Sequence, residues 1–143
     1  AAGAGCPNST NPSGAALVAV GLPSRIADSL VLQGSGMPPS ASVLYFQGTS
    51  QAQVATTGNF GTVFGDGLRC AAGATVRLGF RTNVAGASAI PSAGSPALHV
   101  VGLVPATGAV TRYYQAWYRD ASPTFCTSNR YNLTNGVAVV WVP

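Results

Sequence analysis

The sequence predicts an all-β protein, a single antiparallel β-sandwich of jelly-roll-like type with about eight strands. Eighteen glycines and ten prolines divide the 143-residue chain into short apolar runs. None of these runs keeps the 3.6-residue period of an amphipathic helix, and several alternate apolar and polar residues as strands do. The length is that of one domain, which is long enough to bury a core without further support.

Eight apolar runs are expected to be strands, each bounded by turn-forming residues. In chain order they are 15–20, 29–34, 42–50, 62–64, 75–82, 97–104, 111–120 and 136–142. The residues before them, 1–14, form a polar arm, so the sandwich domain is predicted to span 15–143. The sequence FGDG at 64–67 is typical of a turn.

Alternation assigns side chains to faces in some of these runs. In the run 75–82, Val76, Leu78 and Phe80 fall on one face and the arginines fall on the other. The last run, 136–142, is apolar on both faces, which predicts a central or covered strand.

The composition is poor in charge. Seven Arg, three Asp and one His are present with no Lys or Glu, so charged residues are 7% of the chain, against roughly a quarter in ordinary soluble domains. Low charge removes the repulsion that keeps proteins apart, which favours self-association. The arginines are scattered without a run, so no nucleic-acid partner is expected. No apolar run reaches the ~18 residues that a membrane span needs.

The chain has three cysteines, Cys6, Cys70 and Cys126. They are widely spaced and accompanied by one His, which does not complete a usual zinc set, so no metal site is expected. Cys70 and Cys126 both follow candidate strands, and a Cys70–Cys126 disulfide is the favoured pairing, with Cys6 unpaired or joined to another chain. The alternative, Cys6–Cys70, would fasten the arm and leave Cys126 over. A disulfide, together with the small residues at the start of the chain, predicts an extracellular or cell-surface location.

Catalytic patterns are weak in this sequence. No motif sets a Ser or an Asp beside His99, and the three aspartates are scattered. No nucleophile elbow, P-loop or dinucleotide fingerprint occurs. We therefore expect a protein that is not an enzyme and has no cofactor. Asn8 and Asn132 each begin an Asn-x-Thr/Ser glycosylation pattern, which is common by chance in a chain of this composition.

The run TRYYQAWYRD (111–120) holds four aromatic residues in six positions. On a strand, Tyr114, Ala116 and Tyr118 share one face, and they suit a sandwich core. The opposite face carries Tyr113, Gln115, Trp117 and Arg119. Flat rings mixed with hydrogen-bonding groups are the chemistry of sugar stacking, and Tyr, Trp and Arg also dominate protein interfaces. These four residues are the candidate binding site.

Short motifs give the chain a resemblance to known modules. They are GDGLRC (65–70), YQAWYRD (114–120), FCTSNRYNLTNG (125–136) and the closing VVWVP. With these motifs the chain resembles uncharacterised β-sandwich modules found at the C-terminal end of large secreted bacterial proteins. The resemblance implies secretion and a sandwich fold, and it brings no assigned activity and no catalytic residues. Many such modules have a second Cys soon after the first, which this chain lacks.

Two functions follow as expectations. The first is a secreted, non-catalytic structural protein, a self-associating subunit of an extracellular fibre or surface layer whose partners are other copies of itself. The alternative is a carbohydrate-binding or adhesion module that binds polysaccharide through Tyr113, Gln115, Trp117 and Arg119. Both use the same polar and aromatic strand face, so the surroundings of that face distinguish them.

Overall fold

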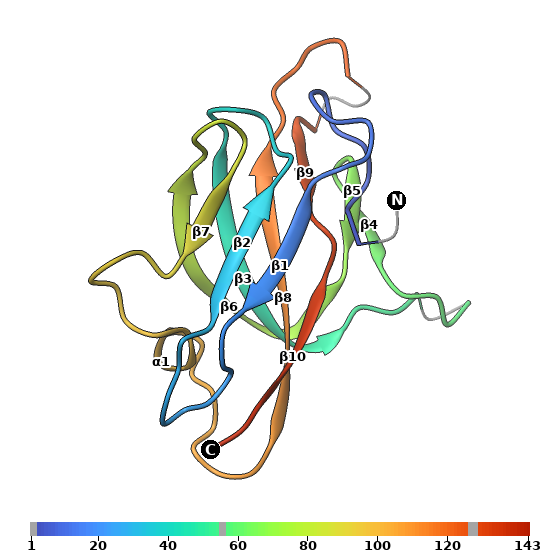
Figure 1. Ribbon diagram of the computed structural model, residues 1–143. Coiled ribbons are helices and arrows are strands. Elements are labelled where there is room, and N and C mark those ends of the chain that lie inside the picture. Colours follow the sequence, from blue (N-terminus) through green and yellow to red (C-terminus); the bar gives the residue numbers. More distant parts are fainter. Residues whose placement is uncertain (1–2, 55–56, 126–128) are drawn as a thin grey trace.

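The computed structural model describes residues 3–54, 57–125 and 129–143, and it confirms the predicted all-β sandwich (Figure 1). The strands of the described chain are β1 (Ala16–Val20), β2 (Val31–Ser35), β3 (Ser42–Gln51), β4 (Thr62–Phe64), β5 (Gly67–Arg69), β6 (Ala71–Thr82), β7 (Ser88–Ile90), β8 (Val110–Arg119), β9 (Tyr131–Leu133) and β10 (Val137–Trp141), with one short helix, α1 (Leu98–Val101). No helix in this part of the chain is long and apolar enough to cross a membrane.

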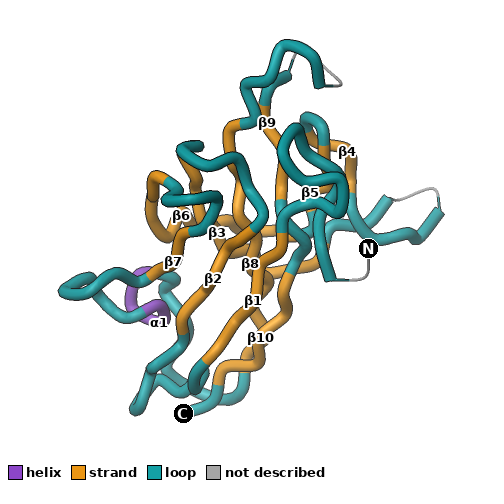
Figure 2. The backbone as a smooth tube through the Cα atoms, turned by 45° about the horizontal axis from the view of Figure 1, so that its top comes forward, coloured by secondary structure: helices purple, strands orange, loops and turns teal. Residues whose placement is uncertain are grey.

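Two sheets form the layers of the sandwich. The smaller has the order β1-β2-β7, and the larger has the order β10-β8-β3-β6, with β9 paired to β8 beyond the end of β10. All strand pairings within the sheets are antiparallel. The smaller sheet lies in front of the larger one in Figure 1, β4 and β5 form a separate hairpin, and the loops gather at both ends of the strands (Figure 2).

The core between the sheets is rich in aromatic residues. Tyr114, Ala116 and Tyr118 are all buried, which confirms the face predicted for them from alternation. The Trp141 indole donates a 2.7 Å hydrogen bond to the Tyr114 hydroxyl, which in turn donates to the side chain of Gln47 at 2.9 Å. Burial raises the pKa of the Tyr114 and Tyr118 hydroxyls well above the usual value, because the phenolate would be stripped of water.

The predicted strand 97–104 is wrong, since its centre is the helix α1. The edge of the smaller sheet is occupied instead by β7, which pairs with β2. The His99 amide donates a hydrogen bond of 3.0 Å to the Asp28 carboxylate. In a strand this amide would pair with a neighbouring strand, whereas at the start of α1 a side chain accepts its hydrogen bond. Only Leu98 of this helix is buried. Tertiary contacts therefore override the apolar pattern of the segment.

The last strand is also misplaced by the sequence interpretation. β10 lies at an edge of the larger sheet and pairs with β8 alone among the described strands. Val139 and Trp141 are buried, and Val140, on the other side, is 54% exposed. Apolar residues on both faces of this strand do not indicate burial of both faces.

A β-bulge in β6 changes the expected alternation of that strand. Leu44 of β3 is opposite Phe80, and Phe46, two residues later, is opposite Arg77 rather than Leu78. Leu78 is the extra residue and packs on the core. Phe80 and Arg77 are thereby brought to the same outer face of the larger sheet, which strict alternation had separated.

The N-terminal arm is packed on the sandwich of its own chain. The amide and hydroxyl of Ser9 both donate hydrogen bonds to the buried carboxylate of Asp120. The Asn8 side chain donates to the Tyr118 hydroxyl at 3.0 Å, and the Asn132 side chain donates to the Pro7 carbonyl at 2.8 Å. Both asparagines of the glycosylation patterns are buried. Their side-chain amides form hydrogen bonds within the fold and are not accessible for attachment of a glycan.

Candidate functional site: a groove of aromatic and arginine side chains

The outer face of the larger sheet is only partly covered. The hairpin β4–β5 shields one part, where Phe64 packs against a second apolar cluster that includes Phe46 and Leu133. Beyond the hairpin, Trp117 of β8 sits opposite Leu44 of β3 in the sheet register. Strand neighbours on one face of a sheet contact each other directly, so this open part presents a continuous apolar floor.

Two adjoining cavities lie on that floor, with volumes of about 400 Å³ and about 200 Å³. Trp117, Leu44 and Arg77 line both cavities. The larger cavity is also lined by Ser42, Val43, Phe80, Tyr118, Arg119, Asn129, Arg130 and Tyr131, and the smaller by Phe46, Phe64, Arg69, Thr75 and Val76. We call the two together the groove.

Trp117 is fixed at the centre of the groove by aromatic neighbours. Its ring centroid is 5.7 Å from that of Phe64 with an interplanar angle of 75°, and 5.4 Å from that of Tyr131 at 71°. Edge-to-face contacts of this kind stabilise a single ring orientation. The indole is only half-buried despite these contacts, so it offers a pre-oriented surface to a ligand.

Four of the seven arginines line the groove, namely Arg69, Arg77, Arg119 and Arg130. The Arg69 side chain donates to the Ala71 carbonyl at 3.0 Å. The guanidinium groups of Arg77 and Arg119 make no hydrogen bond or ion pair within the described ranges. No Asp lines either cavity among those residues. The arginines are scattered along the sequence, and the fold gathers four of them into a cationic patch. Pairing of β3 with β6 and β8 brings Arg77 and Arg119 together, while Arg69 comes from β5 and Arg130 from the residue before β9.

The aspartates of the chain are engaged elsewhere. Asp28 bonds the ring and amide of His99. Asp120 is buried and bonds Ser9, and Asp66 also has an interaction within the chain. Among the described residues, no carboxylate side chain forms an ion pair with Arg77 or Arg119.

The four predicted site residues separate into two pairs. Trp117 and Arg119 line the groove. Tyr113 is half-buried and packs on the second apolar cluster. Gln115 is fully buried, and its amide nitrogen donates to the carbonyls of Leu68 and Thr134, both at 2.7 Å. Gln115 supports the hairpin from beneath and is not accessible to a ligand.

Residues of the groove that the sequence interpretation missed come from other strands. Leu44, Arg77, Phe80 and Tyr131 join Trp117 only through strand pairing and the bulge in β6. Phe80 is 62% exposed. The sequence feature that could have indicated an exposed binding residue here is the position of Phe80 between two arginines in the run 75–82.

Comparison of the chain with protein-family models, curated proteins and solved structures finds no match. The resemblance to secreted bacterial modules stays an expectation. A β-sandwich hosts many unrelated functions, so the fold alone assigns none, and the chemistry of the groove has to carry the functional argument.

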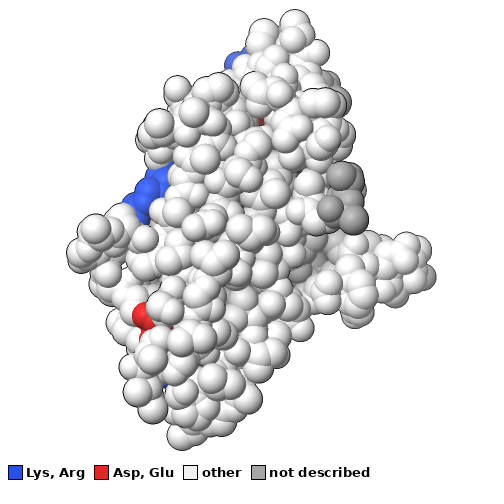
Figure 3. Space-filling model, in the orientation of Figure 1, with Lys and Arg blue, Asp and Glu red and all other residues white. Residues whose placement is uncertain are grey.

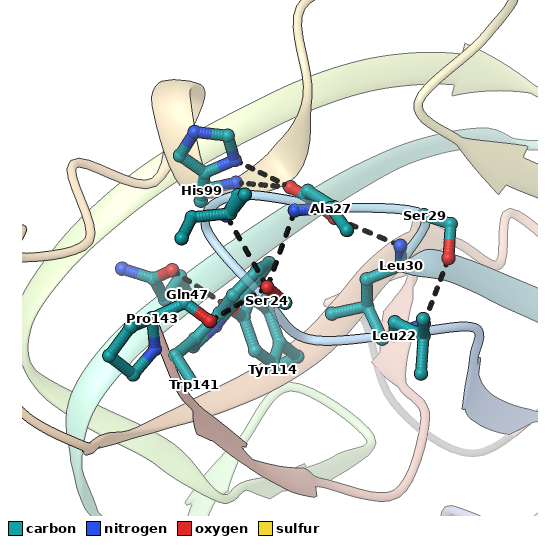
Figure 4. Close-up of polar contacts among 12 residues, drawn as sticks. Leu22, Ser24, Ala27, Ser29, Leu30, Gln47, His99, Tyr114, Trp141 and Pro143 are labelled. Atoms are coloured by element: carbon teal, nitrogen blue, oxygen red, sulfur yellow. Dashed lines mark hydrogen bonds and ion pairs between the residues drawn. The ribbon is translucent and has the colours of Figure 1, made fainter.

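His99 has a carboxylate partner that the sequence did not reveal. Its Nδ1 lies 2.8 Å from Oδ2 of Asp28, 71 residues away in the chain. The loop before β2 brings the aspartate there, and Figure 4 shows the hydroxyls of Ser24 and Ser29 in the same loop directed to Pro143 and Leu22. No hydroxyl of the described residues bonds the His99 ring. The pair ties this loop to α1 without completing a nucleophile and base arrangement.

Cys6 and Cys70 are free thiols in the structure. They line one cavity of about 210 Å³ between the arm, the hairpin and residues 134–136. Burial raises the pKa of the Cys70 thiol. Cys126, the predicted partner of Cys70, lies outside the described residues, so the Cys70–Cys126 pairing stays a prediction.

Proposed function

We propose that the chain is a non-catalytic binding module for acidic polysaccharides, working outside the cell and holding its ligand in the groove. The observation that carries this proposal is the combination of a fixed, half-buried Trp117 with the guanidinium groups of Arg77 and Arg119, which have no partner in the part of the chain that the structure describes. Of the two functions expected from the sequence, the geometry supports the carbohydrate-binding alternative better.

The chemistry of the groove suits sugar rings. A sugar presents an apolar face of C–H groups, which stacks on an aromatic ring such as that of Trp117, and hydroxyl groups around its rim, which need polar partners. Ser42 and Asn129 are polar groups at the margin of the larger cavity. A cavity of about 400 Å³ is within the range that small ligands occupy in proteins.

The charge of the groove points to an acidic ligand. Arginine binds carboxylate and sulfate-like groups with paired hydrogen bonds. A second copy of the chain would offer only its three aspartates to these arginines, and each of them already has an interaction within its own chain. A partner of different chemistry is therefore the better source of negative charge, and a uronic acid polymer supplies carboxylates at the spacing of its rings.

Calorimetric titration of the purified chain with defined oligosaccharides tests this proposal. Oligogalacturonate is expected to bind, and neutral oligosaccharides of the same length are expected to bind much more weakly. Binding should weaken as salt is added, because the arginines are solvent-exposed. Binding of single-stranded DNA with greater affinity than any acidic oligosaccharide would contradict the proposal, as would equal affinity for neutral and acidic sugars.

A separate observation favours self-association through another surface. β1, β2 and β7 contain no charged residue, and Val18 and Val20 of β1 are 48% and 42% exposed. Figure 3 shows the face on which these strands lie almost entirely without charged groups. A second copy of the chain fits this face, because apolar contact between two uncharged surfaces carries no charge repulsion.

Sedimentation analysis at increasing concentration tests the second candidate. We expect oligomers that the double substitution Val18→Glu and Val20→Glu disperses, whereas Val63→Glu on the β4–β5 hairpin, also exposed, leaves them intact. A chain that stays monomeric at high concentration would remove this candidate without affecting the groove. The arm itself is bound to its own sandwich, so donation of the arm to a neighbour is not supported.

A further inference from the structure

The free thiols of Cys6 and Cys70 lie in a cavity with no role in the groove. Cys6 belongs to the arm, and Cys70 stands at the junction of β5 and β6. The cavity that both line has a volume of about 210 Å³ and is completed by Ala4, Gly5, Leu68, Thr134, Asn135 and Gly136. Both residues are partly exposed, so a small reagent can reach them.

The backbone holds Cys70 firmly in this position. Its amide donates a 2.8 Å hydrogen bond to the side-chain oxygen of Gln115, and its carbonyl accepts a 2.7 Å bond from the amide of Ala52. On the third side, a Cβ atom at Gly136 would stand 2.7 Å from the Cys70 Cβ. The glycine is required there because any larger residue would displace the cysteine.

The arm is held just as closely on the Cys6 side of the cavity. The Gly5 amide donates to the Ala15 carbonyl at 2.8 Å. Gly14 has a φ of +81°, and a Cβ atom there would collide with the carbonyls of Gly5 and Cys6. Gly5 itself lies against the carbonyl of Leu133. The two cysteines thus line one small cavity from fixed backbones, and a disulfide between them requires that their separation be closed without large backbone movement.

We propose that Cys6 and Cys70 form an intramolecular disulfide that fastens the N-terminal arm to the β5–β6 junction. The electrostatic influence of the Cys6 thiolate on Cys70 is consistent with this proximity. This pairing is the alternative that the sequence left open beside Cys70–Cys126. Cys126 lies outside the described residues, so the two pairings compete for Cys70 until peptide mapping distinguishes them. It does not depend on the proposed ligand of the groove.

The oxidant is a low-molecular-weight disulfide such as glutathione disulfide. One protein thiolate attacks it, forming a mixed disulfide and releasing one glutathione thiolate. The second protein thiolate then attacks the mixed disulfide and releases the second glutathione. The two cysteines together lose two electrons and two protons, and one glutathione disulfide becomes two glutathione molecules.

Peptide mapping without reduction identifies the pairing directly. The chain has no lysine, and cleavage after its arginines leaves each cysteine on a different peptide, 1–25, 70–77 and 120–130. After equilibration with oxidised and reduced glutathione, we expect peptide 1–25 linked to 70–77. A link of either peptide to 120–130 as the main product, or free thiols at both Cys6 and Cys70, would overturn the proposal.

The variant Cys126→Ser isolates the proposed pair. Its melting temperature should rise by roughly 10 °C on oxidation, because the bridge closes a long loop and restricts the unfolded chain. The matched control, Cys6→Ser with Cys126→Ser, should not change on oxidation. A Cys126→Ser chain that yields no intramolecular link, or one whose melting temperature is the same oxidised and reduced, would contradict a stabilising disulfide.

Discussion

The side-chain oxygen of Gln115 accepts a hydrogen bond of 2.8 Å from the backbone amide of Cys70. The same oxygen is 3.3 Å from the amide of Ala71, and the amide nitrogen bonds Leu68 and Thr134. One side chain thus joins β8 to the start of β6, the end of β5 and the segment before β10. The wall of the groove formed by the hairpin depends on this buried amide.

Replacing Gln115 with leucine is expected to destabilise the protein. The Thr134 carbonyl loses this partner in a buried setting, and the Cys70 amide and the Leu68 carbonyl lose it in a part-buried one, which together costs roughly 2–4 kcal/mol. Urea unfolding measures the loss. The control is Gln33→Leu on the exposed face of β2, for which a change within about 0.5 kcal/mol is expected. Equal effects of the two substitutions would show that the Gln115 bonds contribute little.

Ser9→Ala is expected to loosen the arm. The buried Asp120 carboxylate would lose the hydroxyl donor of Ser9, at a cost of about 1–3 kcal/mol because the acceptor is charged. Amide exchange of residues 4–14 should accelerate more than that of β3 and β8. Ser13→Ala serves as the control, since the Ser13 side chain is exposed. Unchanged exchange in the arm would contradict the anchoring role of Ser9.

Stability should fall steeply in alkaline solution. Burial raises the folded-state pKa of Tyr45, Tyr114 and Tyr118. Between the unfolded pKa of about 10 and the higher folded values, the unfolded chain releases protons that the folded chain keeps, so stability is full below about pH 10 and is lost above it. Tyr114 and Tyr118, whose shifts are large, predict a loss of roughly 2 kcal/mol from about pH 10 to 11, and Tyr45 acts in the same direction.

Urea unfolding across this pH range checks the expectation. Tyr118→Phe should remove roughly 1 kcal/mol of this loss, because one buried hydroxyl with a strongly raised pKa is removed. A stability that is flat from about pH 9 to 11 would contradict the retention of these protons in the folded state.

Arg77→Gln and Arg119→Gln should each weaken the binding of oligogalacturonate by roughly three- to tenfold and make it less sensitive to salt. Each substitution removes one exposed cation from the groove. Arg25→Gln is the matched control, since Arg25 bonds the Gly108 carbonyl and lines neither cavity. Equal effects of all three substitutions would indicate attraction by net charge rather than by the groove.

Much of the fold follows from the sequence for a simple reason. Strand alternation is local, so the core face of β8 and the outer face with Trp117 were predicted from residues 111–120 alone. Turn residues are local too, and Gly65 and Asp66 form the predicted turn between β4 and β5. Partners of buried polar groups are not local, and this is why the sequence alone assigns Gln115 to the candidate binding site.

The rest depends on pairing across the chain. The bulge that brings Phe80 and Arg77 to one face is visible only in the register with β3. No sequence pattern within β6 predicts it. Asp28 and His99 meet across 71 residues. The arginine cluster has the same origin, because four separate segments contribute to it. A charge patch in a β-sandwich depends on which strands lie next to each other, and the spacing of residues along the sequence does not predict this.

The indole N–H signals of the two tryptophans give the most direct test of the groove. Trp117 lines the groove, whereas Trp141 is buried and bonds Tyr114, and the variant Trp117→Phe assigns the two signals. On titration of ¹⁵N-labelled protein with oligogalacturonate, the account predicts that the Trp117 signal shifts in a saturable manner while the Trp141 signal stays in place. A ligand-saturated spectrum in which the Trp117 signal does not move would contradict it.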